Sequence, residues 1–208
     1  MLRRIPKLYL ASESPRRVAL LESVFISFTA AAPNIDETHR DGESPVDYVE
    51  RLALEKTLAT RGGTEAVIIG ADTVVVLDDE ILGKPRDATE AQSTLTRLSG
   101  RSHHVITGLA VRRVDEGSSP DEDRLAVGST ISQVTFVQLS PDEITAYIAT
   151  GEPMGKAGAY AIQGAGGAFV SEISGNYQNI VGLPLTLLRR LINDLGYLWP
   201  GLPVGPYT

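Results

Sequence analysis

One carboxylate interrupts the longest apolar run of the sequence, which reads AVIIGADTVVVL over residues 66–77. Asp72 stands within it, after Gly70-Ala71 and before a β-branched stretch. An ionised carboxylate inside a buried strand is costly unless it is paired or bound to a metal, so such a residue usually faces a site. A structural buried ion pair is the alternative. In a site, Asp72 could coordinate a metal ion or activate a water molecule.

Two cations stand where a helix is expected to begin. Arg16 and Arg17 follow Ser14-Pro15, a serine cap with proline at the first helical position. A cation at this end of the helix dipole costs about 0.3–1 kcal/mol unless an anion binds beside it. With the hydroxyls of Ser12 and Ser14 and the N–H groups of the helix end, the two guanidinium groups could form a phosphate-binding site. Two solvated arginines on a surface helix fit the pattern equally well.

Two lysines add to the positive charge. Lys56 shares one face of a predicted helix with Val49, Leu52 and Ala53, so it either reaches into a cleft or extends its ammonium to the edge of the apolar surface, the commoner case. Lys84 lies between a glycine and a proline, directly after a predicted hairpin. It could contact a metal-bound polyphosphate, and an exposed loop lysine is the alternative. Neither Gly-Lys pair of the chain is followed by Ser or Thr, which excludes a Walker P-loop.

Further oxygen ligands could come from the polar loop over residues 33–43, where Asp36 and Glu37 stand side by side. On their own they are ordinary polar residues of a loop. The chain has no cysteine and only three histidines, which excludes disulfides, iron–sulfur centres and cysteine nucleophiles and argues against a zinc site. Any metal is therefore expected to be one that prefers oxygen ligands, such as Mg²⁺.

Glycine is concentrated in one part of the chain, with 8 of the 20 glycines between residues 151 and 182. The densest stretch, GAYAIQGAGG over residues 158–167, does not have the strand–helix context of a dinucleotide-binding turn. Small residues around Gln163 suggest a backbone pressed close to a flat ligand, because a glutamine amide can both donate to and accept from the edge of a base. A glycine-rich hairpin without a ligand is the alternative.

The elements that must position these residues follow a mixed α/β pattern. Strands are predicted over residues 7–11, 27–32, 66–77, 80–82, 103–114 and 125–139, and shorter ones over 160–163 and 168–173. Helices are predicted to begin at residues 15, 45, 88, 141 and 184. Three of them begin at the proline of a Ser-Pro pair. Strands and helices alternate early and strands pair antiparallel later, so we expect a mixed twisted sheet flanked by helices, bent into two lobes with a cleft between them.

Composition limits the partners. The 208 residues carry 19 basic and 26 acidic side chains, a net charge of −7, which argues against a nucleic-acid binder but permits a local basic pocket. No stretch reaches the roughly 18–20 apolar residues of a membrane span, and the N-terminal residues lack the pattern of a signal peptide. We therefore expect a cytoplasmic protein without a membrane partner.

Five blocks taken together resemble one family. They read LASESPRR over residues 10–17, GADTVV over 70–75, GKP over 83–85, GKAGAYAIQG over 155–164 and GNYQNIVGLPL over 175–185. In this order and spacing the chain resembles the Maf (septum-formation-inhibitor-like) nucleoside triphosphate pyrophosphatases over about residues 8–190, and most of all the branch that acts on dTTP and UTP. The resemblance implies one Maf-like domain over residues 1–208 with an irregular tail from about residue 197.

The resemblance also implies a fold, a reaction and a site. The fold would be an elongated α/β molecule with a deep cleft between two lobes, like that of inosine triphosphate pyrophosphatases, and often dimeric. The reaction would convert a nucleoside triphosphate and water to the monophosphate and pyrophosphate, with Mg²⁺ or Mn²⁺. The implied roles are catalysis by Asp72, metal binding by Glu37 and Asp72, phosphate binding by Ser12, Arg17, Lys56 and Lys84, joined by Ser14, and substrate specificity through Arg16, Thr73 and Gln163.

The chain departs from this pattern in three places. Glu13 puts an acid between two serines predicted to bind phosphate, residues 115–124 form a longer loop than a hairpin needs, and the proline-rich tail has no counterpart. Two other functions use similar residues. A nucleotidyltransferase also needs an acid, a metal and basic phosphate contacts, and a regulator of cell division could bind nucleotide without turnover.

Overall fold

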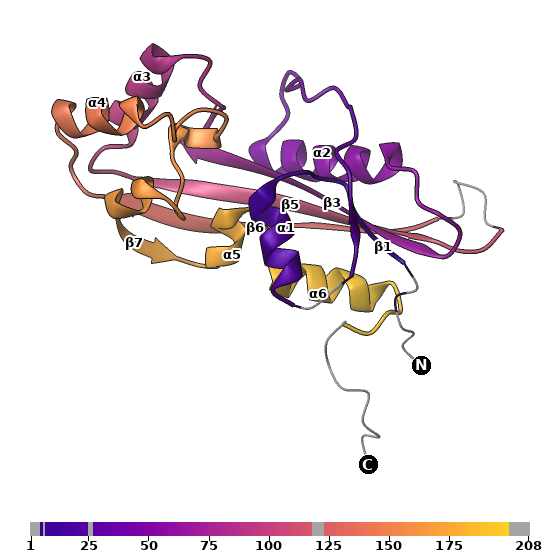
Figure 1. Ribbon diagram of the computed structural model, residues 1–208. Helices are drawn as coiled ribbons and strands as arrows, with labels where there is room; N and C mark the ends of the chain where they lie inside the picture. Colours follow the sequence, from indigo (N-terminus) through magenta and orange to yellow (C-terminus); the bar gives the residue numbers. More distant parts are fainter. Residues whose placement is uncertain (1–4, 6, 25–26, 118–122, 200–208) are drawn as a thin grey trace.

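Seven strands form one mixed sheet in the computed structural model, which describes residues 5, 7–24, 27–117 and 123–199 (Figure 1). They are β1 (Leu8–Leu10), β2 (Thr29–Ala30), β3 (Ala66–Leu77), β4 (Glu80–Leu82), β5 (Ser102–Val114), β6 (Arg124–Phe136) and β7 (Val170–Ser174). Their order is β2-β1-β3-β5-β6-β7, and β4 pairs with β3. The pairs among β1, β2 and β3 are parallel and all others are antiparallel, which confirms the predicted mixed sheet.

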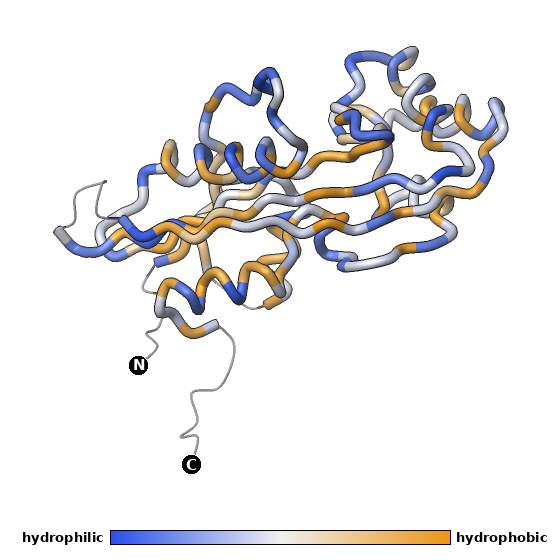
Figure 2. The backbone as a smooth tube through the Cα atoms, turned by 180° about the vertical axis from the view of Figure 1, so that it is seen from behind, coloured by the Kyte–Doolittle hydropathy of each residue, from blue (hydrophilic) through white to orange (hydrophobic). Residues whose placement is uncertain are grey.

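Helices cover both faces of the long strands, as predicted. They are α1 (Pro15–Glu22), α2 (Pro45–Ala59), α3 (Ala88–Leu98), α4 (Pro141–Ala149), α5 (Tyr177–Val181) and α6 (Leu185–Asp194). In Figure 1, α2 lies on one face of the sheet and α6 on the other, while α3 and α4 lie at the end away from the chain termini. Hydrophobic and hydrophilic residues alternate along α6 in Figure 2. The buried leucines of this helix pack in one cluster with residues of the sheet.

Side-chain caps fix the start of most of these helices. The Ser44 hydroxyl accepts from the Asp47 N–H, and the Asp87 carboxylate accepts from the Glu90 N–H. Ser140 heads α4 in a full capping box. At α1, by contrast, Ser14 occupies the capping position without a side-chain cap bond, so its hydroxyl is not used by the helix.

The buried residues form two larger clusters at opposite ends of the long strands. One joins α6 and β1 to the sheet through residues such as Leu10, Leu109 and Leu188. The other joins α3 and α4 to the far end of the sheet around Phe136 and Leu95. The strands β3, β5 and β6 run through both clusters, so they provide a rigid connection between the two ends.

Several predicted elements differ from the structure, and the glycine-rich block differs most. Residues 160–163 are not a strand: they lie between two 3₁₀ segments, Ala157–Ala159 and Ala165–Phe169, and Ile162-Gln163 form a turn. Glycines permit these tight turns, and periodicity cannot detect them. The helix α5 was not predicted, because five residues are too few to show a helical repeat. The strand expected over residues 27–32 is reduced to Thr29–Ala30.

Parts of two predicted features lie outside the described residues, namely the centre of the 115–124 loop and the tail after residue 199. Within the residues that are described, we find no helix with the length and apolar character needed to cross a membrane.

Candidate active site

The candidate site lies at a gap in the sheet. β3 pairs with β1 through residues 67–69 and with β4 through residues 75–77, so residues 70–74 pair on one side only, with β5. Asp72 and Thr73 stand in this gap, and they line a cavity of about 400 Å³. The remaining lining comes mainly from residues 11–17, 32–33, 37, 56, 84, 155–157, 160–162 and 180–181. The topology thus brings residues from all five sequence blocks to one cavity, and the short block over residues 83–85 contributes its lysine, Lys84.

Two glycines let α2 lie directly on the sheet beside this gap. A Cβ atom on Gly70 would stand 2.1 Å from the Ala53 carbonyl oxygen, and one on Gly108 would stand 2.4 Å from the carbonyl oxygen of Val49. Gly70 and Asp72 share one face of β3, because side chains alternate along a strand. Lys56 comes one turn after Ala53 on the helix, so the close approach at Gly70 brings Lys56 over Asp72.

Lys56 lies between two carboxylates. Its Nζ is 2.6 Å from Asp72 Oδ1 and 2.8 Å from Glu37 Oε1. The side chains of Lys56 and Asp72 are only 9% and 13% exposed, so the pair is largely removed from water and its charges interact strongly. Lys84 Nζ lies 3.8 Å from the other oxygen of Glu37. The lysine on the apolar face of its helix therefore reaches into a site.

Opposing influences act on the pKa of Glu37. Burial alone would raise it, but the hydrogen bond and charge of Lys56, together with the charges of Lys84 and Arg17, outweigh burial and hold the pKa below its ordinary value. Glu37 is therefore ionised at neutral pH. The site presents two carboxylates, which are suited to a metal ion or a water molecule, beside cations suited to phosphates.

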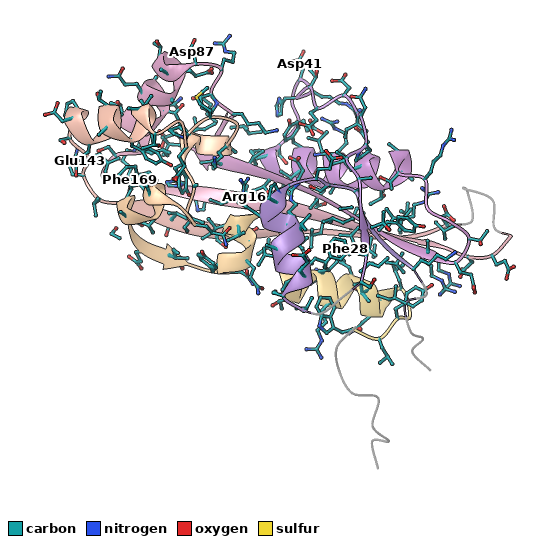
Figure 3. The ribbon with its side chains drawn as sticks, viewed as in Figure 1. Arg16, Phe28, Asp41, Asp87, Glu143 and Phe169 are labelled. Carbon is teal, nitrogen blue, oxygen red and sulfur yellow. The ribbon has the colours of Figure 1, made fainter. Side chains whose placement is uncertain are left out.

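The loop that carries Glu37 is fastened to α2. Tyr48 donates its hydroxyl to the Glu37 carbonyl oxygen at 2.7 Å. Burial and the charges of Asp72 and Glu37 raise the pKa of Tyr48 to about 12, so this donor keeps its proton. Arg51 donates to the Thr38 carbonyl at 3.1 Å and to both carboxylate oxygens of Glu43. Figure 3 shows Asp41 at the top of this loop, above α2.

The Glu43–Arg51 pair should make the stability of the protein pH-dependent. The hydrogen bond from Arg51 lowers the pKa of Glu43 from 4.5 to about 2. A carboxyl with a depressed pKa in the folded state stabilises above its unfolded pKa, and the contribution is lost as the pH falls through the folded value. For Glu43→Gln we therefore expect a free energy of unfolding lower by about 1.5–3 kcal/mol at pH 7, and a weaker dependence on pH between 4.5 and 2.

Urea unfolding at a series of pH values tests this expectation. Glu80→Gln is the matched control, because Glu80 also pairs with an arginine, Arg97, but its side chain is 62% exposed and surface pairs contribute little. If Glu43→Gln retained the full pH dependence of the wild-type protein, the pair would not be what holds the loop.

Arg17 is held by three acceptors on the other side of the gap. Its Nε donates to the Gly182 carbonyl at 2.9 Å, Nη1 to Ser12 Oγ at 3.2 Å and Nη2 to Thr73 Oγ1 at 3.0 Å. Burial lowers the pKa of Arg17 and the charge of Asp72 acts against this, but an arginine with an ordinary value of 12.5 stays charged. Ser12 is buried and Arg17 partly buried, so this cation has a fixed position in the cavity wall.

Of the other predicted site residues, two line the cavity and one does not. Ser14 and Arg16 both line the cavity, and Figure 3 shows Arg16 at the N-terminal end of α1. Glu13 also lines the cavity and is exposed. Gln163 is exposed and is not among the lining residues, although Ile162 directly before it is. The structure therefore gathers the predicted phosphate and metal residues and leaves Gln163 at the edge.

Sequence reasoning missed the residues that hold the site in place. Tyr48 and Arg51 lie three residues apart on α2, a spacing that puts them on one helix face, but nothing in the sequence indicates that this face meets the 33–43 loop. Gly182 contributes its carbonyl group, which accepts from Arg17, and Thr107 contributes a buried hydroxyl, which donates to the Asn179 carbonyl. No sequence pattern indicates either contact.

The donor set fits a small divalent ion held partly by substrate. Among the described residues, no group of three or more His, Asp or Glu side chains could hold a metal by itself. Glu37 and Asp72 are nevertheless brought together on one ammonium group. Mg²⁺ is usually bound through one or two carboxylates together with phosphate oxygens, so these two residues suit an ion that arrives with a polyphosphate.

Comparison with known proteins identifies the family. The family model for Maf-like protein matches residues 7–195, which is nearly the whole chain. The chain belongs to the Maf family. Two relatives of this Maf protein, from Symbiobacterium thermophilum and Alcanivorax borkumensis, bear the name dTTP/UTP pyrophosphatase. Each is 47% identical to it, over 92% and 94% of this chain and 95% and 96% of the relative's chain.

Among solved structures, a HAM1 protein from Coxiella burnetii is similar to part of this Maf protein. Its TM-score is 0.44 and its sequence identity is 18%, over 67% of this chain and 75% of that chain.

Proposed function

We propose that this Maf protein hydrolyses dTTP and UTP to the monophosphate and pyrophosphate, with a divalent metal. The observation that carries the proposal is Lys56 Nζ between Asp72 and Glu37, in a cavity that also holds Arg17 and Lys84. Paired carboxylates beside fixed cations suit the attack of water on a polyphosphate better than simple nucleotide binding. The names of the relatives, which match over nearly their whole length, supply the substrate class.

In this proposal each charged group has a separate role. Asp72 accepts a proton from a water molecule, whose oxygen forms a bond to the α-phosphorus. The bond from the α-phosphorus to the bridging oxygen breaks, and pyrophosphate leaves with that oxygen. Arg17, Lys56 and Lys84 stabilise the charge that gathers on the leaving group. A bound Mg²⁺ or Mn²⁺ would be held by Glu37 and Asp72 and would polarise the phosphate oxygens.

One assay separates this function from its alternatives. The purified protein is given dTTP, UTP, CTP, ATP and GTP, and modified pyrimidine triphosphates, each with Mg²⁺, Mn²⁺ or Co²⁺, and pyrophosphate and monophosphate are measured. Equal amounts of both products, with water as the only acceptor, support the pyrophosphatase. Products that require a second acceptor indicate a nucleotidyltransferase, and binding of dTTP without hydrolysis at any metal indicates a regulator. Homodimerisation, which the family resemblance implies, and a cytoplasmic location, which the sequence pattern implies, stay predictions.

Base selection provides a second test. We propose that Gln163 reads the uracil or thymine edge from the rim of the cavity, directly after Ile162 in its wall. We expect Gln163→Ala to lower the ratio of kcat/KM for dTTP to that for CTP by about tenfold, because a site that hydrogen-bonds one base leaves its own polar groups unpaired with another. The kcat for dTTP should change much less. Gln92→Ala, at an exposed position of α3, is the control.

The result against a role for Gln163 would be an unchanged ratio in Gln163→Ala. An equal loss for every nucleotide would also contradict it, since that would indicate damage to the phosphate site instead of to base selection.

A further inference from the structure

Three hydrogen bonds in series lead from Arg17 into the sheet behind the cavity. Arg17 Nη2 lies 3.0 Å from Thr73 Oγ1, and Thr73 Oγ1 lies 2.9 Å from Thr107 Oγ1. Thr107 Oγ1 lies 2.9 Å from the carbonyl oxygen of Asn179 in α5. Thr73 and Thr107 are opposite one another in the register of β3 and β5. Thr107 and Asn179 are both 0% exposed, so water does not compete for these bonds.

The two ends of this series fix the direction of every proton in it. The Asn179 carbonyl can only accept, so the single hydroxyl proton of Thr107 is committed to it. The guanidinium of Arg17 can only donate, so Thr73 Oγ1 must accept from Nη2. The proton of Thr73 therefore goes to Thr107, and the series runs one way from Arg17 through Thr73 and Thr107 to Asn179.

We propose that Thr107 is a positioning residue for Arg17, which it reaches only through Thr73. By accepting the Thr73 proton, it turns a lone pair of Thr73 toward the guanidinium. Without Thr107 as acceptor, the Thr73 hydroxyl is free to rotate and to point its proton at the cation. The inference rests on the proposed function in one respect, namely that Arg17 binds the phosphates of the substrate.

The position of the guanidinium depends on this third contact. Gly182 O and Ser12 Oγ take two of the five N–H donors of Arg17, and Thr73 takes a third. Three acceptors on different nitrogens fix both the direction and the plane of a guanidinium, whereas two leave it able to tilt. Within the contacts described here, two N–H groups are left for a phosphate, and their direction is set by the other three.

The experiment measures binding of inorganic tripolyphosphate by titration calorimetry, together with steady-state dTTP hydrolysis. Thr107→Val keeps the shape of the side chain and removes the hydroxyl, and Thr107→Ser keeps the hydroxyl. We expect Thr107→Val to weaken tripolyphosphate binding about tenfold, and Thr107→Ser to restore it to near the wild-type value. In a background of Arg17→Lys, adding Thr107→Val should have no further effect, because the group that Thr107 positions is gone.

Thr57→Val is the matched control. Thr57 is also 0% exposed, but its hydroxyl donates only to the nearby Leu54 carbonyl within α2, so binding should not change. If Thr107→Val lowers the thermal midpoint too far for binding studies, Thr107→Ala replaces it.

Two results would overturn the inference. One is tripolyphosphate binding by Thr107→Val equal to the wild-type value. The other is that adding Thr107→Val weakens tripolyphosphate binding equally in the wild-type protein and in Arg17→Lys. The proposed function fails separately, if the wild-type protein releases no pyrophosphate from dTTP while it still binds tripolyphosphate.

Discussion

Replacing Asp72 by asparagine is expected to lower dTTP turnover by about a thousandfold and to leave the fold intact. Asparagine has the same shape but cannot accept a proton from water, and general-base catalysis typically contributes about 10²–10⁴ in rate. Lys56 keeps its second partner, Glu37, at 2.8 Å, so the substitution does not leave a buried cation unpaired. We therefore expect a large fall in kcat, with a thermal midpoint close to that of the wild-type protein.

The measurement is pyrophosphate release under saturating dTTP, with circular dichroism to confirm the fold. Asp79→Asn is the control, because Asp79 lies in the exposed turn that follows the same strand and asparagine tolerates its positive φ of 64°. Near-wild-type pyrophosphate release by Asp72→Asn would remove Asp72 from the mechanism. A KM for dTTP in Asp72→Asn close to that of the wild-type protein would indicate that the loss lies in the chemical step and not in substrate binding.

The sequence indicated the charged residues of this site because each stands out from its surroundings. Asp72 interrupts an apolar strand, Lys56 interrupts an apolar helix face, and Arg17 stands at the positive end of a helix dipole. Each is energetically unfavourable by itself and becomes favourable when a site supplies a partner of opposite charge or a hydrogen-bond acceptor. The structure brings all three to one cavity. Residues that are costly where they stand can be recognised in a single sequence.

The supporting residues could not be found in this way, because they cost nothing locally. Thr107 is an ordinary β-branched residue of a strand, and Tyr48 and Arg51 are ordinary residues of a helix. Their roles depend on which elements meet in space, and the gap between β1 and β4 on β3 is likewise a property of strand pairing. Caps and long strands were predicted well because their signals are local. The glycine-rich turns were not, since glycine permits several conformations without specifying one.

Among glycine-to-alanine substitutions near the site, Gly70→Ala is expected to lower the stability of the fold the most. The new Cβ would stand 2.1 Å from the Ala53 carbonyl oxygen and 2.8 Å from Thr57 Cγ2. The nearest atom belongs to backbone, so no side chain can rotate away and the helix α2 must move. Overpacking of this kind costs about 1–3 kcal/mol in the free energy of unfolding, which for a chain of this size lowers the thermal midpoint by roughly 2–12 °C.

Movement of α2 would also impair the chemistry, because the same helix carries Lys56 to Asp72 and Glu37. A displacement of about 1 Å at a catalytic group can cost about a hundredfold in rate, so we expect kcat/KM for dTTP to fall by at least tenfold at a temperature where the variant is fully folded. Gly63→Ala is the control, because the nearest atoms to its new Cβ would be side-chain atoms of Lys7 and Tyr9, at 3.5 Å or more, and not the backbone of α2. Thermal unfolding and dTTP hydrolysis are measured on both variants. A loss of stability without a loss of activity in Gly70→Ala would mean that the position of Lys56 does not depend on the close contact between helix and sheet, and that the ion pair alone holds the two carboxylates together.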